Sequence, residues 1–225
     1  MANVQIWNKK NIKKNSIFPH FPITSILRST LSNSYYRNTK KIKKNKTILD
    51  IGTLYLNNLK PFHDRSCKIY GTEVTEESCA IAKSIAKKNK IKCIIKKGLN
   101  SNLPFKKNFF DLILSINTLH YEEGIGDIKR ALLEFKRVLK PGGCLVVETV
   151  GPKHFMCTSS EKIKNDVFKL KLKKDIRNNN NFFFFNSKKQ IIKIFSKYFK
   201  KIEIAEILEE YPKKKINFFD IKCFK

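Results

Sequence analysis

The alternation of apolar runs with helical segments across residues 47–150 is the feature that most constrains how this 225-residue chain can fold. Short apolar runs that end in glycine or polar residues are typical of strands buried in a parallel sheet. Five such runs predict strands at 47–52, 67–74, 91–95, 110–115 and 144–148. A chain that alternates strands with helices forms a parallel sheet with helices on both faces. The sequence therefore predicts an α/β fold with a doubly wound sheet.

The helices predicted between these strands have recognisable ends. Thr75 is predicted to start the first helix, because Glu76 and Glu77 follow it in the first turn. The second helix is predicted over residues 128–139, where apolar side chains recur at helical spacing. It is predicted to stop at residues 140–143, Lys-Pro-Gly-Gly, since proline and glycine end helices.

Polar residues follow the ends of four predicted strands. Asp50 and Gly52 end the first strand, and Glu73 ends the second, 21 residues beyond Gly52. Nucleotide-binding folds present an acid to the ribose hydroxyls at this distance. Asn100 follows the third strand, and residues 115–117 follow the fourth. Because parallel strands bind ligands at their carboxyl ends, we expect these side chains to converge on one crevice.

The segment from Lys46 to Val150 resembles the class I S-adenosylmethionine (SAM)-dependent methyltransferases. Five stretches carry the resemblance. Residues 48–52 resemble the first family motif, 70–75 the second, 98–105 the loop that flanks the adenine, and 109–115 the fourth strand. Residues 133–143 are the most specific match. The resemblance implies a Rossmann-like sheet of seven strands whose last strands form an antiparallel pair. Four segments can supply that ending: 182–185, a helix over 187–198, 201–208 and 216–224.

The same resemblance implies SAM as the cofactor and assigns residues to its binding. In the family, the acid of the second motif, here Glu73, holds both ribose hydroxyls. The implied cofactor-binding residues are Asp50, Gly52, Thr53, Glu73, Val74, Asn100, Ser115 and Asn117. An acid that many relatives carry in the adenine loop is replaced by Leu99, and the adjacent Asn100 is expected to bond the adenine amine instead.

The first loop departs from the family pattern. Relatives place glycines where this chain has Leu54 and Leu56. Glycine at such positions lets the backbone approach the cofactor and adopt positive φ. The leucines therefore leave three alternatives: retained cofactor binding, a rearranged loop, or a non-catalytic copy of the fold.

Two histidines are the candidate catalytic residues. His120 follows the fourth strand and is the first candidate for a general base, because imidazole titrates near neutrality. His154 follows the fifth strand and is the second candidate. The alternative for each is a hydrogen-bonded loop histidine. Motifs for exocyclic-amine or C5-pyrimidine methylation are absent from the sequence, which leaves O- or N-methylation of a small-molecule or sugar-like acceptor.

The net charge of +28 is concentrated in the flanks of the chain. Residues 1–49 contain 11 Lys or Arg and no acid, whereas residues 50–152 carry a net charge of only +6. Lysine accompanies abundant Asn and Ile, which share A/T-rich codons, so base composition explains much of this charge. The alternative function is a non-catalytic methyltransferase-fold protein that binds RNA or another polyanion through its basic flanks.

The chain is expected to divide into a basic N-terminal arm or short helical extension (1–45) and a methyltransferase domain (46–225). A helix over residues 23–31 is expected to pack on the domain, and residues 155–185 are expected to form a lid over the acceptor site. No apolar stretch is long enough for a membrane span. The six cysteines form no CxxC pair and no zinc-type cluster, so no metal is expected. Free thiols favour a cytoplasmic location, with import into an organelle through the basic arm as the alternative.

Overall fold

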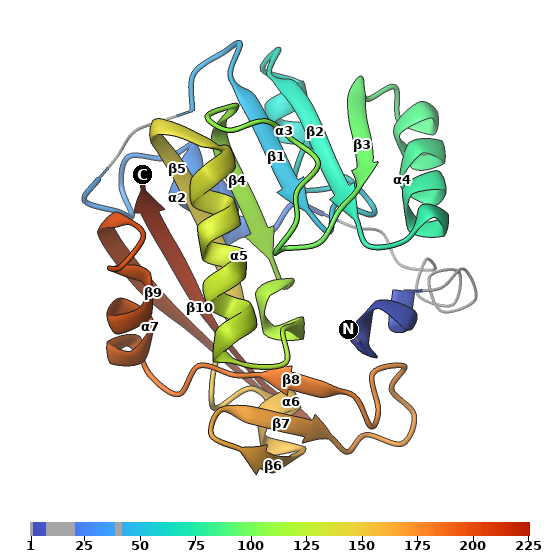
Figure 1. Ribbon diagram of the computed structural model, residues 1–225, viewed down its shortest axis with the longest axis vertical. Helices are drawn as coiled ribbons and strands as arrows, with labels where there is room; N and C mark the ends of the chain where they lie inside the picture. Colours follow the sequence, from blue (N-terminus) through green and yellow to red (C-terminus); the bar gives the residue numbers. More distant parts are fainter. Residues whose placement is uncertain (1, 8–20, 39–41) are drawn as a thin grey trace.

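The computed structural model describes residues 2–7, 21–38 and 42–225 (Figure 1). Among these residues, seven strands form one mixed sheet in the order β3-β2-β1-β4-β5-β10-β9. Its strands are β1 (Thr47–Ile51), β2 (Lys68–Glu73), β3 (Cys93–Lys97), β4 (Phe110–Ile116), β5 (Leu139–Val150), β9 (Lys200–Tyr211) and β10 (Lys214–Phe224). The first five are parallel, and β10 runs antiparallel to both β5 and β9. The predicted seven-stranded fold with an antiparallel C-terminal pair is confirmed.

Helices cover both faces of this sheet. The α-helices are α2 (Thr24–Thr30), α3 (Lys60–His63), α4 (Glu76–Lys88), α5 (Ile125–Val138), α6 (Phe155–Thr158) and α7 (Lys188–Phe195). On one face, α5 and α7 bury Phe135 and Phe195 against the sheet. On the other face, α2, α3 and α4 bury Ile26, Phe62 and Ala82. The central strands β1 and β4 thus lie between two apolar layers, which is why they read as nearly continuous apolar runs.

The predicted helix ends are present in the structure. Thr75 caps α4 by a capping box: its hydroxyl accepts a hydrogen bond from the Ser78 amide, and the Ser78 hydroxyl accepts one from the Thr75 amide. The helix α5 ends at Val138, one residue before the predicted end, and β5 begins directly at Leu139. The predicted helix over 23–31 corresponds to α2, whose Ile26 is fully buried in the core.

A second sheet holds the first half of the phenylalanine run 182–185, which the sequence assigned to the end of the main sheet. Its antiparallel strands are β6 (Ser160–Lys164), β7 (Val167–Leu170) and β8 (Asn181–Phe183). The run alternates between two cores: Phe183 and Phe185 join the core of the main sheet, and Phe182 and Phe184 join a separate cluster. An extended chain points successive side chains to opposite sides, so a core on each side suits four consecutive phenylalanines.

The second sheet faces the carboxyl ends of β1, β2 and β4 across the middle of the molecule (Figure 1). The 3₁₀ helix η1 (Ala2–Trp7) lies beside the same region. Part of the predicted N-terminal arm, residues 8–20 and 39–41, lies outside the described residues. No helix in the described part of the chain has both the length and the apolar character of a membrane span. The same part of the chain holds no His, Cys, Asp and Glu cluster that could bind a metal.

Candidate functional site

The first loop, at the carboxyl end of β1, approaches β2 and β4 closely at Gly52. The Gly52 amide donates a 2.9 Å hydrogen bond to the Thr72 carbonyl oxygen. Gly52 has φ +71°, and a Cβ placed on it would lie 2.7 Å from Cγ2 of Thr118. Only glycine meets both conditions, because other residues strain at this φ and would clash with Thr118. This glycine therefore brings the ends of β1 and β4 together.

Leu56 does not enter the crevice. Its backbone has φ +57°, the left-handed conformation that glycine adopts most easily. Its side chain is fully buried in the core beneath the loop, in the same cluster as Leu59 and Phe62. The burial of a leucine side chain offsets the cost of a non-glycine residue in this conformation. The second unusual leucine thus packs inward, while its backbone keeps a conformation that glycine adopts easily.

Leu54 contributes its backbone to the site. The Leu54 amide donates a 2.7 Å hydrogen bond to Oε1 of Glu73. The Leu54 side chain is 7% exposed, and it belongs to none of the apolar clusters formed by the described residues. The first loop is therefore tied directly to the acid at the end of β2.

Two buried carboxyl groups lie at the ends of β1 and β2. Burial raises the pKa of Glu73 to about 7, although hydrogen bonds from the Leu54 amide, the Ser78 hydroxyl and the Val74 amide lower it. Burial, with a smaller contribution from the nearby Glu73, raises the pKa of Asp50 to about 8, although a hydrogen bond from the Thr53 hydroxyl lowers it. Ligand groups that donate hydrogen bonds or carry positive charge stabilise such carboxyls in their ionised form.

Asn100 and Ser115 meet at Thr118, just beyond β4. The Ser115 and Thr118 hydroxyl oxygens lie 2.7 Å apart, and the Asn100 side-chain amide donates to the Thr118 carbonyl oxygen at 3.3 Å. Asn100 also donates to Oε1 of Glu122 at 2.8 Å. Asn100 Oδ1 is buried and has no hydrogen-bond partner among the described residues. Buried polar atoms without partners are rare, so this oxygen marks a place where a ligand can bond.

Asn117 points toward a different polar cluster. Its side-chain amide donates to Oε1 of Glu148 at 2.9 Å, and the Ser25 hydroxyl donates to Oε2 of Glu148 at 2.9 Å. Asp220 pairs with Glu148 in the β5–β10 register. Burial raises the pKa of both carboxyls, and proximity to Glu148 raises that of Asp220 further, to about 8. The side chain of Asn117 therefore points away from the group formed by Asn100, Ser115 and Thr118.

Sequence reasoning missed this carboxyl pair, although a signal was present. Glu148 interrupts the apolar run 145–150, and Asp220 interrupts the run 218–221. An acid within a strand that is buried on both faces needs hydrogen-bond partners. Which partners they find depends on the β5–β10 register and on α2, and neither can be read from the local pattern.

His120 lies in an aromatic shell at the end of β4, in the 3₁₀ helix η2 (Leu119–Tyr121). Its ring stacks on Tyr121 with centroids 4.8 Å apart, and the ring of Phe182 lies 6.2 Å away. The side chain is 2% exposed, and Nδ1 has no hydrogen-bond partner among the described residues. Burial lowers the pKa of His120 to about 3, with smaller contributions from Arg177 and His154. The imidazole is therefore neutral at pH 7.

His154 follows β5 and caps the helix α6. Its Nδ1 accepts a 3.1 Å hydrogen bond from the Met156 amide at the start of α6. Its ring packs on Phe155 and Phe218, with centroids 4.6 and 4.9 Å apart. Burial lowers its pKa to about 4. This geometry favours the alternative of a hydrogen-bonded loop histidine for His154.

The segment η1 connects the two sides of the site, which the sequence did not indicate. The Thr75 hydroxyl, just after β2, donates to the Trp7 carbonyl oxygen at 3.5 Å. The Trp7 ring lies 5.7 Å from that of Tyr121. The Asn3 side-chain amide donates to the carbonyl oxygens of Tyr121 and Asn181, both at 2.7 Å. Residues 2–7 therefore contact the end of β2, the end of β4 and the second sheet.

Comparisons with known proteins agree with this fold. A family model described as "Methyltransferase domain" matches residues 49–147. A SAM-dependent methyltransferase from Thermotoga maritima has 22% sequence identity and a TM-score of 0.66, with 100% of each chain covered. A SAM-dependent methyltransferase from Methanosarcina mazei has 19% identity and a TM-score of 0.66, and the match covers 82% of this chain and 94% of that one.

Curated relatives match over shorter stretches. An uncharacterised protein of Methanocaldococcus jannaschii is 33% identical over 116 residues, which is 52% of this chain and 50% of the relative. The chain matches half or less of the length of its curated relatives. A methyltransferase-domain model thus matches the central part of the chain, and the fold is that of the class I SAM-dependent methyltransferases. The cofactor of this class is SAM, as the sequence resemblance implies.

Proposed function

We propose that this protein transfers the methyl group of SAM to an oxygen or nitrogen atom of a small-molecule or sugar-like acceptor. The observation that carries the proposal is the buried Glu73 carboxyl at the end of β2, held by the Leu54 amide beside the glycine turn at Gly52. A carboxylate at this position accepts hydrogen bonds from ribose hydroxyls. When bound, SAM would supply a methyl group attached to a positively charged sulfur, and that sulfur is the leaving group of the transfer.

The residues present fit this cofactor. Leu56 packs in the core, so it does not block the approach to the first loop. The unpartnered Asn100 Oδ1 can accept a hydrogen bond from the adenine amine, and Glu73 can hold the ribose. The buried Asp50 carboxyl lies close to Glu73, where ionisation of either group favours a cationic ligand.

We assign the acceptor to the aromatic shell around His120. The neutral imidazole can accept a hydrogen bond from an acceptor hydroxyl or amine and so orient it toward the methyl group. A histidine with a pKa of about 3 binds a proton poorly at pH 7, so its proposed role narrows from general base to positioning residue. Phe182 of β8 and Phe184, which follows β8, line the same shell, which supports residues 155–185 as the acceptor-site lid.

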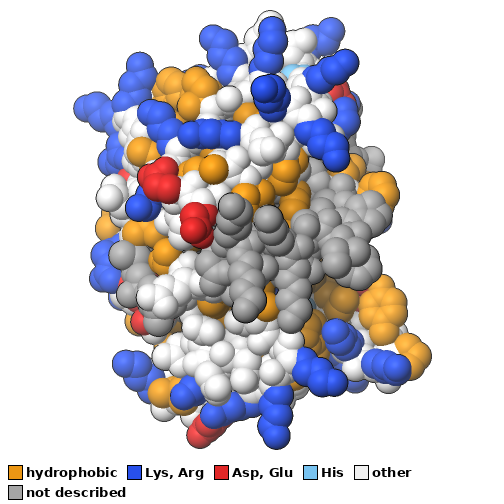
Figure 2. Space-filling model, turned by 90° about the vertical axis from the view of Figure 1, so that its right-hand side faces the viewer, with side chains coloured by type: hydrophobic (Ala, Val, Ile, Leu, Met, Phe, Trp, Pro, Cys, Tyr) orange, Lys and Arg blue, Asp and Glu red, His pale blue; other side chains and the backbone are white. Residues whose placement is uncertain are grey.

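The alternative of a non-catalytic polyanion-binding protein receives less support. Leu56, one of its motivating residues, does not fill the crevice. Figure 2 shows lysine and arginine side chains at both ends of one face of the molecule, outside the grey residues. Charge spread in this way fits compositional bias better than a single binding surface.

Binding of SAM should change the fluorescence of Trp7, the single tryptophan of the chain. The Trp7 carbonyl accepts from Thr75, next to the end of β2, so a ligand at Glu73 alters its surroundings. We expect micromolar affinity by both fluorescence titration and calorimetry. In the control Trp7→Phe the fluorescence signal should vanish while the calorimetric heat remains. The absence of heat at high protein concentration would contradict the proposed function.

Replacing His120 with phenylalanine should lower kcat/KM about 10-fold, because the aromatic packing is kept while the hydrogen bond to the acceptor is lost. S-adenosylhomocysteine release with a panel of hydroxyl and amine acceptors measures this change. At saturating SAM, where ionisation of Glu73 no longer limits cofactor binding, the wild-type profile for the acceptor should show no inflection near pH 6.5, since His120 does not titrate there. The control His154→Ala should leave kcat/KM unchanged and cost about 1 kcal/mol of stability as a lost helix cap. Equal loss of activity in both variants would refute the role of His120.

A further inference from the structure

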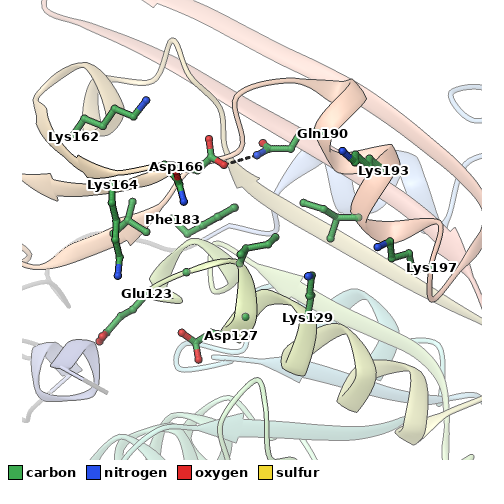
Figure 3. Close-up of a pocket in the computed structure, with 16 residues that line it drawn as sticks. Glu123, Asp127, Lys129, Lys162, Lys164, Asp166, Phe183, Gln190, Lys193 and Lys197 are labelled. Carbon is green, nitrogen blue, oxygen red and sulfur yellow. Dashed lines mark hydrogen bonds between the residues drawn. The ribbon is translucent and has the colours of Figure 1, made fainter.

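A pocket outside the proposed cofactor crevice opens between the start of α5, the helix α7 and the hairpin of β6 and β7 (Figure 3). Its volume is about 780 Å³, within the range of small-molecule sites. The crevice residues Gly52, Glu73 and Asn100 are not among those that line it. A ligand here would occupy a site distinct from that of the cofactor.

Lysines from three separate parts of the chain surround this pocket. They are Lys129 of α5, Lys162 and Lys164 of β6, Lys193 of α7 and Lys197, which follows α7. All five are exposed, and none takes part in an ion pair between described residues. Five like charges around one hollow repel one another, so an anion bound between them would relieve that repulsion.

The acids that line the pocket are fewer than the lysines: they are Glu123, Asp127 and Asp166. Asp127 pairs with Arg130 on its own helix. Asp166 accepts hydrogen bonds from Gln190 at 2.6 Å and from Asn186 at 3.2 Å. Figure 3 shows Glu123 and Asp127 directed away from the α7 side of the pocket, where Lys193 and Lys197 lie. Asp166 is thus the one lining acid beside α7, where Lys193 and Lys197 outnumber it.

The floor of the pocket is apolar. Val167, Phe183 and Ile194 line it, and each is less than 10% exposed, at 5%, 1% and 8%. A concave site with an apolar floor and lysines on its rim suits a small molecule that has both an apolar part and phosphate groups. A nucleic-acid strand needs instead an open track of charge with aromatic faces for its bases.

We propose that this lysine pocket binds the phosphate groups of a small phosphorylated molecule. Lys193 lies in the last turn of α7, and Lys197 follows four positions later, just beyond the end of the helix. Residues at this spacing lie close together, so the two ammonium groups can contact neighbouring phosphates. Lysine binds phosphate as a point charge through its three donors, without the fixed geometry of arginine. The proposal concerns a second site and does not depend on the activity proposed above.

Calorimetric titration of the full chain with inorganic tripolyphosphate, at 150 mM salt and without SAM, tests this site. We expect saturable binding with one molecule per chain. The variant K193E/K197E should bind at least about 10-fold more weakly, since it loses two charge-assisted contacts. The matched control K83E/K87E changes the charge equally at the same spacing on the exposed side of α4, and it should bind like the wild type.

Three results would overturn the proposal. The first two are non-saturable binding of tripolyphosphate by the wild type and equal weakening in both variants. The third is a uridine 12-mer that binds more tightly than tripolyphosphate and loses affinity to the same extent in K193E/K197E. The last result would assign the surface to RNA. Circular dichroism confirms that each variant is folded. Titration of K193E/K197E with SAM separates this site from the crevice, because cofactor binding should be unchanged there.

Discussion

Replacing Glu73 with glutamine should weaken SAM binding by about 100-fold, since two ribose hydroxyls would lose their bonds to an ionised carboxylate. Glutamine keeps the shape of the side chain, and its Oε1 can still accept from the Leu54 amide at the position seen in the structure. The loop should therefore stay in place, and the loss should reflect the missing charge. Calorimetry at pH 8, where the wild-type carboxylate is ionised, gives the largest difference.

The pH dependence of binding separates this role from a structural one. In the free protein the pKa of Glu73 is raised to about 7, so the carboxyl is mostly protonated at pH 6 and mostly ionised at pH 8. If SAM binds the ionised form, its affinity should rise about tenfold per pH unit below 7 and level off above it. The Glu73→Gln variant should show a flat profile through the same range.

The exposed Glu76, in the first turn of α4, offers a matched control. Glu76→Gln removes the same charge a few residues from Glu73, and it should leave both the affinity and the pH profile unchanged. A wild-type affinity that does not vary between pH 6 and 8 would contradict an ionised Glu73 as the ribose ligand. Equal losses in Glu73→Gln and Glu76→Gln would show that general charge, not this carboxylate, controls binding.

The parallel sheet was predictable because its signals are local. Each strand from β1 to β5 is an apolar run, and the residues that follow the strands meet because parallel strands share a carboxyl edge. Gly52, Glu73, Asn100 and Ser115 were found in this way, and the structure places them around the first loop and Thr118.

Features that depend on distant partners could not be predicted. Asn117 follows β4 like its neighbours, but it bonds Glu148 of β5, where Ser25 of α2 also donates. The run 182–185 has the composition of a core strand, but its sequence does not indicate whether that strand joins the main sheet or a second one. The pKa of about 3 for His120 follows from burial, which is a property of the packed shell. Local patterns place a residue at a strand end, and tertiary packing decides which way it faces.

Restoring glycine at position 56 should destabilise the protein by about 3 kcal/mol rather than improve it. Removing a fully buried leucine costs about 3–5 kcal/mol, and relief of the positive φ returns about 1–2 kcal/mol. Urea denaturation should show a lower midpoint with an unchanged slope. Leu56 therefore belongs to the packing of this loop, although the family pattern has glycine there.

The companion variant Leu54→Gly should behave differently. Leu54 lies outside the apolar clusters of the described residues, so its loss should cost about 1 kcal/mol, near the average for a point substitution. Its amide keeps the bond to Glu73, and the missing side chain gives the cofactor more room, so SAM affinity should rise. If Leu56→Gly raised affinity and left stability unchanged, the side chain of Leu56 would lie in the crevice. The loop would then be a blocked version of the family motif, and the proposed methyl transfer would lose its cofactor site.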